Sequence, residues 1–192
     1  MKRRSFLRRT GSFGAALSLS RSLSSGQAAP SERVRAGFVG VAGRAGTLLK
    51  EFASEKDVEV VGLAEIDPRR VPGAMRMLEE LDIKPPPVHT DFRRLIDDES
   101  IDVLVVGTPD HWHAIPTIMA CQAGKDVYVE KPDGHNLVEG QRMVAAMRKH
   151  KRIVQMGTQL RSSPRMVEAM EYLRSGLQLL AGAGPEATIQ SA

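Results

Sequence analysis

The sequence predicts a doubly wound α/β domain built on a parallel sheet. Two observations carry this prediction. Short runs rich in Val, Ile and Leu alternate with longer segments of helical periodicity over residues 33–176. The apolar runs are nearly continuous, as strands are when helices cover both faces of a parallel sheet. Repeated strand–helix units of this length are typical of the doubly wound class.

Local signals place each element. The predicted strands are residues 33–40, 58–67, 101–109, 126–132 and 152–159. The predicted helices are residues 47–56, a segment within 68–83, then 91–100, 111–124, 136–151 and 162–176. Asp91 and Asn136 are the expected N-caps of two helices, and Gly124 is expected to end another. The KPPP segment at 84–87 is expected to form an extended turn, because proline has no N–H and restricts the residue before it.

The charge of the chain is concentrated at its start. The 192 residues hold 27 Lys and Arg against 23 Asp and Glu, but residues 1–29 hold six of the basic residues and no acidic one. The remainder has 21 basic and 23 acidic residues, a net charge of −2. Its charge therefore gives no reason to expect a nucleic acid partner.

Cysteine and histidine patterns give no metal site. Cys121 is the single cysteine, so neither an intrachain disulfide nor a cysteine metal cluster is expected. His111 and His113 flank a tryptophan at the start of a predicted helix, where residues two apart do not share a face. No metal is therefore expected.

Residues 1–29 have the order of an export signal, with a basic start, a weakly apolar middle and a small-residue end. Arg3 and Arg4, followed by Ser-Phe-Leu, resemble the twin-arginine export signal. We expect this segment to direct the chain to the periplasm or beyond, and a cytoplasmic location if the signal does not function. A disordered basic tail is the alternative. The apolar run is too short and too polar to span a bilayer, so no stable membrane insertion is expected.

A glycine-rich loop follows the first predicted strand. A dinucleotide fingerprint uses glycines for a tight turn, for close approach of the pyrophosphate and for helix–strand packing. Aligned from Gly40, Ala42 and Ala45 replace the second and third glycines, with a glycine one residue after each. The match is imperfect, but its place between a strand and a helix favours phosphate binding at the helix N-terminus. The predicted loop contacts are Gly40, Ala42, Gly43 and Arg44.

An acidic residue stands where the adenine ribose is expected. Glu65 follows Gly40 by 25 residues, at the end of the second predicted strand, close to the usual spacing of about 20 residues. Asp67 is the neighbouring candidate. A carboxylate repels a 2′-phosphate and so favours NAD, whereas Arg69 and Arg70 weaken that preference. The expected cofactor is NAD, with NADP left open; solvated loop charges are the structural alternative.

Two further motifs give a family resemblance. VVGTPDHWH at 105–113 and YVEKP at 128–132, with the glycine loop, resemble the N-terminal domain of the Gfo/Idh/MocA oxidoreductases, the glucose–fructose oxidoreductase and inositol dehydrogenase family. GTQLRSSP adds to the resemblance, which covers about Val34 to Gly176. It implies an NAD(P)-binding Rossmann domain over residues 33–160 and a crossover helix over 161–176.

The resemblance also implies roles for single residues. Thr108 and Pro109 would line the cofactor site, and His113 would lie near the nicotinamide. Glu130 and Lys131 would match the family's glutamate–lysine pair, whose lysine contacts nicotinamide and substrate. All end predicted strands at one edge of the sheet, where open α/β folds bind ligands. Lys131 is the expected catalytic residue, able to orient a substrate hydroxyl or accept its proton. The structural alternative is a Glu130–Lys131 ion pair that closes the strand.

Family members have a second domain that supplies the substrate pocket, and this sequence stops resembling them before it. Residues 177–192 are expected to form an unstructured tail unrelated to the family. Three functions remain open. The first is an NAD(P)-dependent oxidoreductase for a small carbohydrate-like substrate, with this chain as the nucleotide-binding part. The second is an inactive nucleotide-binding fragment, and the third is an NAD-dependent glycosidase of the same family.

Overall fold

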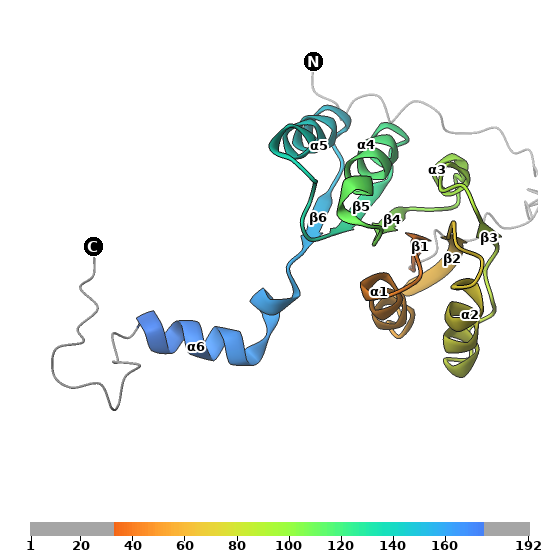
Figure 1. The fold of residues 1–192 in the computed structure, drawn as a ribbon, viewed down its shortest axis with the longest axis horizontal. Coiled ribbons are helices and arrows are strands. Elements are labelled where there is room, and N and C mark those ends of the chain that lie inside the picture. Colours follow the sequence, from red (N-terminus) through yellow and green to blue (C-terminus); the bar gives the residue numbers. More distant parts are fainter. Residues whose placement is uncertain (1–32, 175–192) are drawn as a thin grey trace, which may run out of the picture. The chain divides into compact units, whose positions relative to one another are not determined.

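The computed structural model describes residues 33–174, and the predicted signal segment and tail lie outside them. The described residues form a six-stranded sheet in the order β3-β2-β1-β4-β5-β6 (Figure 1). The strands are β1 (Val34–Val39), β2 (Val58–Ala64), β3 (Val88–His89), β4 (Val103–Val106), β5 (Asp126–Glu130) and β6 (Val154–Gly157). Every neighbouring pair is parallel, which confirms the doubly wound Rossmann fold.

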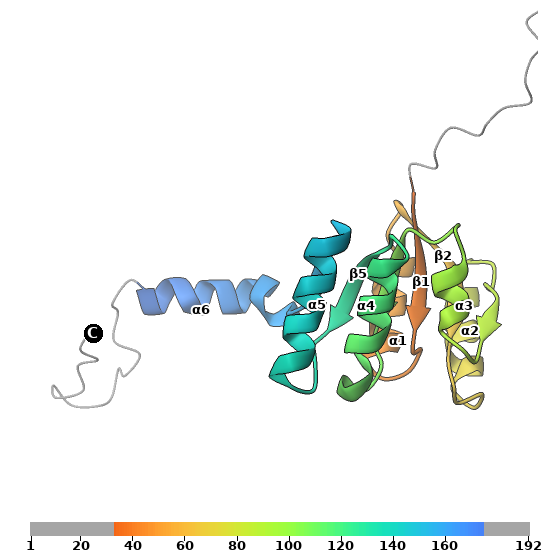
Figure 2. The same cartoon turned by 90° about the horizontal axis from the view of Figure 1, so that it is seen from above.

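Helices cover both faces of the sheet (Figure 2). One face carries α1 (Arg44–Ala53) and α2 (Val71–Glu80). The other face carries α3 (Arg93–Asp97), α4 (Ala114–Gln122) and α5 (Leu137–His150). Two short 3-10 helices, η1 (Asp110–Trp112) and η2 (Gln159–Ser162), precede α4 and α6 (Pro164–Arg174). No side chain of α6 is buried.

The two faces bury separate core clusters. Phe38 and Leu63 pack with Leu48 and Leu78 on the α1–α2 face. The opposite cluster combines strand residues with residues of α3, α4 and α5, and includes Val39, Leu104, Val106, Val129, Cys121 and Met143. Successive strand residues point to opposite faces, so burial of both faces requires apolar residues throughout. This is why the strands read as continuous apolar runs.

The sheet has one strand that the sequence did not predict. β3 follows the proline segment and pairs with β2 at the edge of the sheet. The amides of Leu63 and Glu65 donate to the carbonyls of Pro87 and His89, at 3.0 and 2.9 Å. Pro87 is tolerated at this edge of the sheet because it accepts a hydrogen bond through its carbonyl and needs no N–H to donate. A strand of two residues is too short to show a hydrophobic pattern in the sequence.

Two helix starts differ from the prediction. α1 begins at Arg44, three residues before the predicted start, so the end of the glycine loop is already helical. α3 begins at Arg93, and Phe92 occupies its N-cap position. Asp91 lies one residue earlier, although its carboxylate still accepts the Arg93 N–H at 3.0 Å.

Two predicted helix ends are confirmed. The Asn136 side chain caps α5 by accepting the Glu139 N–H at 3.0 Å. Gly124 follows α4 with a φ of +79°, a left-handed conformation that glycine adopts without strain.

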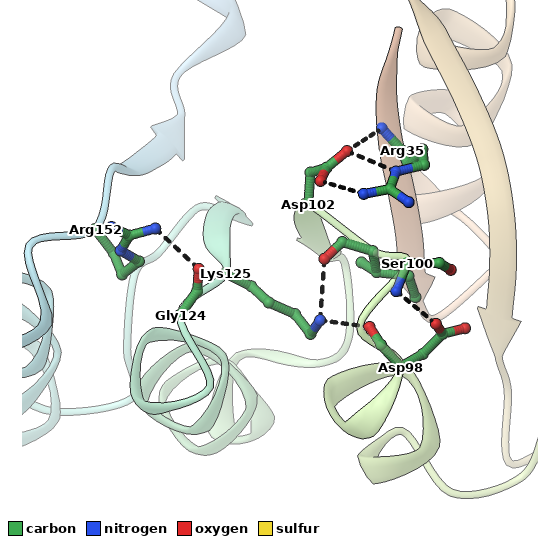
Figure 3. A network of polar contacts seen from close by, with 8 residues as sticks. Arg35, Asp98, Ser100, Asp102, Gly124, Lys125 and Arg152 are labelled. Atoms are coloured by element: carbon green, nitrogen blue, oxygen red, sulfur yellow. Dashed lines mark hydrogen bonds and ion pairs between the residues drawn. The ribbon is translucent and has the colours of Figure 1, made fainter. Parts of the chain in front are cut away.

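A buried lysine ties the strand starts together at the amino edge of the sheet (Figure 3). Lys125 is 4% exposed, and its Nζ donates to the carbonyls of Asp98 at 2.6 Å and Ile101 at 3.0 Å. Beside it, Arg35 of β1 and Asp102 before β4 form a two-pronged ion pair. Burial lowers the pKa of Lys125. The network holds the segment before β4 against the start of β5.

Lys125→Met is expected to lower the free energy of unfolding by about 1–3 kcal/mol at neutral pH, because one buried and one partly buried carbonyl lose their donor. The loss should grow as the pH rises toward the unfolded pKa of 10.5. The folded wild type releases the Lys125 proton before the unfolded chain does, so its stability rises with pH in that window. Urea unfolding at neutral and alkaline pH checks both effects, with the exposed Lys149→Met as control. A difference that stays constant or shrinks would contradict the assigned pKa direction.

Candidate active site

The candidate site lies at the carboxyl edge of the sheet. β1 and β4 are neighbours in the middle of the sheet. The strand order continues from β1 through β2 to β3 at one edge, and from β4 through β5 to β6 at the other, so it reverses between β1 and β4. In open α/β sheets this reversal leaves a crevice at the carboxyl ends of the strands. The loops after β1, β4 and β5 meet there, and they carry most of the residues that the sequence singled out.

The glycine loop after β1 is tightly bent. Gly40 has a φ of +87°, and a Cβ atom at this position would lie 3.1 Å from the Gly107 carbonyl oxygen. Gly43 has a φ of +58° and occupies the N-cap position of α1. Among the described residues, none would lie within 4 Å of a Cβ atom at Gly43, so these residues leave the backbone at this end of α1 open to a ligand. The loop therefore combines a glycine-dependent turn with an accessible helix start.

Ala45 replaces the third fingerprint glycine, and Gly107 makes room for it. A Cβ atom at Gly107 would lie 2.6 Å from the Cβ and 2.9 Å from the Cα of Ala45. In the fingerprint, a glycine in the helix allows the helix and the strand to pack closely. Here the glycine that allows this packing is Gly107, at the end of the neighbouring strand β4. Sequence reasoning missed this pairing, although the glycine that directly follows the apolar run of β4 was the available signal.

Glu65 joins the end of β2 to the glycine loop. One carboxylate oxygen of this buried residue accepts the Val41 N–H at 3.2 Å, and the other accepts the Asp67 N–H at 2.9 Å. Each oxygen keeps a second lone pair for another donor. Glu65 therefore shapes the loop directly, and its contact with a ribose stays a prediction.

Asp67 is held by arginines beside this loop. Arg69 donates to its carboxylate through Nε at 2.9 Å, and Arg70 lies 3.4 Å away. Hydrogen bonds from Arg69 hold the pKa of Asp67 well below its usual range. The Asp67 carboxylate thus partly neutralises the charges of Arg69 and Arg70 near the predicted ribose position.

The ion pair at the end of β5 joins Glu130 to Arg44. Arg44 Nε donates to Glu130 Oε1 at 3.0 Å, and the Glu130 side chain is only 5% exposed. Among the described residues Glu130 pairs with Arg44, so the alternative interpretation of a Glu130–Lys131 ion pair is not supported. The other Glu130 oxygen accepts the backbone N–H of Lys131 at 3.2 Å, so Glu130 fixes the main chain of Lys131 and leaves its ammonium group uncommitted.

The Lys131 side chain is exposed at this edge. Its ammonium group makes no hydrogen bond or ion pair with any residue between 33 and 174. The peptide bond that joins it to Pro132 is cis. The structure thus presents a free cationic side chain beside the end of β4, on a backbone that Glu130 fixes.

His113 lies behind this edge. The residue is 1% exposed, and its ring lies between two carbonyl oxygens, with Nε2 2.7 Å from that of Thr108 and Nδ1 2.5 Å from that of Pro132. Thr108 Oγ1 donates to the Trp112 carbonyl at 3.1 Å, and the exposed Pro109 leads into η1. The loop is thus internally bonded, and a direct nicotinamide contact of His113 stays a prediction.

Between residues 33 and 174, no three His, Cys, Asp or Glu residues are grouped so as to hold a metal ion. Over the same range, no helix has the length and apolar character needed to cross a membrane.

Residues 34–158 match the family GFO_IDH_MocA, described as an oxidoreductase family with an NAD-binding Rossmann fold. A glycosyl hydrolase family 109 protein of Stenotrophomonas maltophilia is 33% identical over 111 residues, which are 55% of this chain and 24% of that protein. An α-N-acetylgalactosaminidase of Shewanella oneidensis is 30% identical over 105 residues, 53% of this chain and 23% of that protein.

A solved structure gives the same picture. The myo-inositol 2-dehydrogenase of Lactobacillus plantarum superposes with a TM-score of 0.64 at 27% identity, over 75% of this chain and 42% of that one. The chain thus spans about a quarter of the length of the curated relatives that it matches, and about two fifths of this dehydrogenase.

Proposed function

The chain belongs to the Gfo/Idh/MocA oxidoreductase family, and on that premise we propose that it binds a nicotinamide dinucleotide for hydride transfer on a sugar, polyol or derivative. The observation that carries this proposal is the free ammonium group of Lys131 at the carboxyl edge, on a backbone fixed by Glu130. If Lys131 only closed the strand, its ammonium group would form an ion pair with a carboxylate. Within the described residues it forms no such pair.

The glycine loop and α1 are suited to a pyrophosphate. The N-terminus of a helix offers N–H groups and the positive end of its dipole to phosphate oxygens. Gly40 bends the loop, and the open position at Gly43 lets a phosphate approach the backbone. Ala42 and Arg44 flank Gly43 in the chain, and the Arg44 guanidinium pairs with Glu130 and Glu51. These residues hold the diphosphate, while Glu65 accepts from the adenine ribose.

The other half of the edge is suited to the nicotinamide. Thr108, Pro109 and Lys131 line the ends of β4 and β5 next to the loop. A bound nicotinamide ring supplies the hydride acceptor or donor. Lys131 orients a substrate hydroxyl and holds or receives its proton. The family resemblance implies that a second domain completes the substrate pocket.

We expect NADH to bind about tenfold more tightly than NADPH, because the Glu65 carboxylate repels a 2′-phosphate and Asp67 neutralises the neighbouring arginines. Calorimetric titration of the 192-residue chain with each dinucleotide measures the ratio. Glu65→Gln should reduce it, whereas Asp67→Asn, which releases Arg69, should favour NADPH. Equal affinity of wild type for both dinucleotides would contradict the role of Glu65.

A second candidate function is an NAD-dependent glycosidase. It is favoured by the names of the two relatives above, a glycosyl hydrolase family 109 protein and an α-N-acetylgalactosaminidase. Such an enzyme oxidises its sugar only transiently, so cleavage leaves no net NADH. Incubation with NAD and a panel of inositols, sugars and aryl N-acetylgalactosaminides separates the candidates. NADH accumulation supports the oxidoreductase, aryl alcohol release without NADH supports the glycosidase, and binding without turnover supports a nucleotide-binding fragment.

A further inference from the structure

We propose that His113 is a positioning residue that locks the loop after β4 to the Lys131–Pro132 segment and so presets the nicotinamide half of the site. This inference rests on the proposed binding of a nicotinamide dinucleotide. In this role His113 acts through its neighbours, because the residue is 1% exposed and its ring nitrogens face two main-chain carbonyls.

The backbone of His113 is fixed before its ring makes any contact. Its N–H donates to the Asp110 carbonyl at 3.0 Å, which closes η1. Its own carbonyl accepts the hydroxyl of the fully buried Thr117 at 2.8 Å, one turn into α4. The ring is therefore aimed by both the 3-10 turn and the helix that follows.

The ring bridges two loops that are distant in sequence. Thr108 lies five residues before His113, and Pro132 lies 19 residues after it. Both partners are main-chain carbonyl oxygens, which only accept, so the ring is the donor in any hydrogen bond with them. A partly buried carbonyl that loses its donor costs free energy. The bridge thus resists separation of the two loops.

The bridge holds the segment that carries the free ammonium group. Glu130 fixes Lys131 on its N-terminal side by accepting its N–H, and the His113 ring holds the carbonyl of the next residue, Pro132. The side chain between these two anchors stays uncommitted. When the backbone is already fixed and the reactive side chain is free, less conformational entropy is lost as a ligand binds.

The bridge also reaches the opposite wall of the same half-site. The bonded Thr108 carbonyl belongs to the residue that the family resemblance assigns to the cofactor, and Pro109 follows it. A change at His113 should therefore loosen the walls from β4 and β5 together. It should not disturb the glycine loop, which Glu65 holds from β2.

The test separates the two halves of the cofactor. The 192-residue chain is titrated by calorimetry with NADH and with ADP-ribose, which lacks the nicotinamide ring. His113→Gln is expected to weaken NADH about tenfold, the equivalent of about one hydrogen bond, and to change ADP-ribose by less than about twofold. His111→Gln, an exposed residue of the same turn, is the matched control and should change neither.

Two results would overturn the inference while leaving dinucleotide binding intact. One is an equal loss of NADH and ADP-ribose affinity in His113→Gln, and the other is no loss of either. Nitrogen-15 spectra of the wild-type histidine rings supply a readout that needs no variant. We expect at least one slowly exchanging ring N–H group for His113, and a His113 ring with no protected N–H would refute the bridge. Wild type that binds neither ligand would instead refute the proposed function.

Discussion

Lys131→Ala is expected to lower turnover about 10²- to 10⁴-fold and to change the Kd of NADH by less than about threefold. The separation follows from the geometry. The Lys131 backbone is held by Glu130, so removing the side chain leaves the cofactor walls in place. What is lost is the group that orients a substrate hydroxyl and exchanges its proton, an interaction that matters most in the transition state.

The measurement pairs initial rates on the substrate found by the panel with calorimetric titration of NADH. Lys149→Ala, at the exposed end of α5, is the matched control for the loss of one positive charge. It should leave both quantities unchanged. If Lys131→Ala weakened NADH as strongly as it slowed turnover, Lys131 would be a binding residue rather than a catalytic one.

Gly107→Ala is expected to lower the free energy of unfolding by about 1–3 kcal/mol, because its methyl group would overpack the contact with Ala45. Both the Cα and Cβ atoms of Ala45 lie within van der Waals distance of the added atom, so α1 must move away from β4. Since α1 carries the glycine loop at its start, dinucleotide affinity should fall as well. Chemical denaturation and calorimetry measure the two losses.

A double-mutant cycle tests the cause of this loss. Ala45→Gly alone should cost about 1 kcal/mol through helix propensity. Combined with Gly107→Ala it should recover part of the stability, because the closest clash is removed while that with the Ala45 Cα remains. Gly73→Ala, in open space within α2, is the control and should not destabilise. Strictly additive losses would show that the two residues are not paired.

The sequence predicted the fold because both faces of this sheet are buried. Strands such as β4 therefore appear as uninterrupted apolar runs, and caps such as Asn136 precede their helices in the expected way. It also predicted that the glycine loop and the TPDHWH and EKP motifs end strands at one edge. That convergence needs only parallel strands and family motifs, both of which are visible in a single sequence.

The contacts that shape the site were not predictable from sequence. Arg44 and Glu130 are 86 residues apart, and charge alone gave Glu130 a nearer partner in Lys131. The match of Ala45 with Gly107 depends on how closely α1 approaches β4, which no local pattern encodes. The bridge from His113 to Pro132 ends on a main-chain carbonyl, and every residue has one. Such contacts are set by tertiary packing.

Titration of the 192-residue chain with NADH tests the central claim most directly. Trp112, the single tryptophan, packs edge-on against Phe92 beside the loop after β4, so its emission reports on this edge. We expect saturable binding of one NADH per chain, with quenching of Trp112 emission, transfer of its energy to the nicotinamide and a matching calorimetric isotherm. No change in fluorescence or heat at millimolar NADH or NADPH would contradict a dinucleotide site at the carboxyl edge of the sheet.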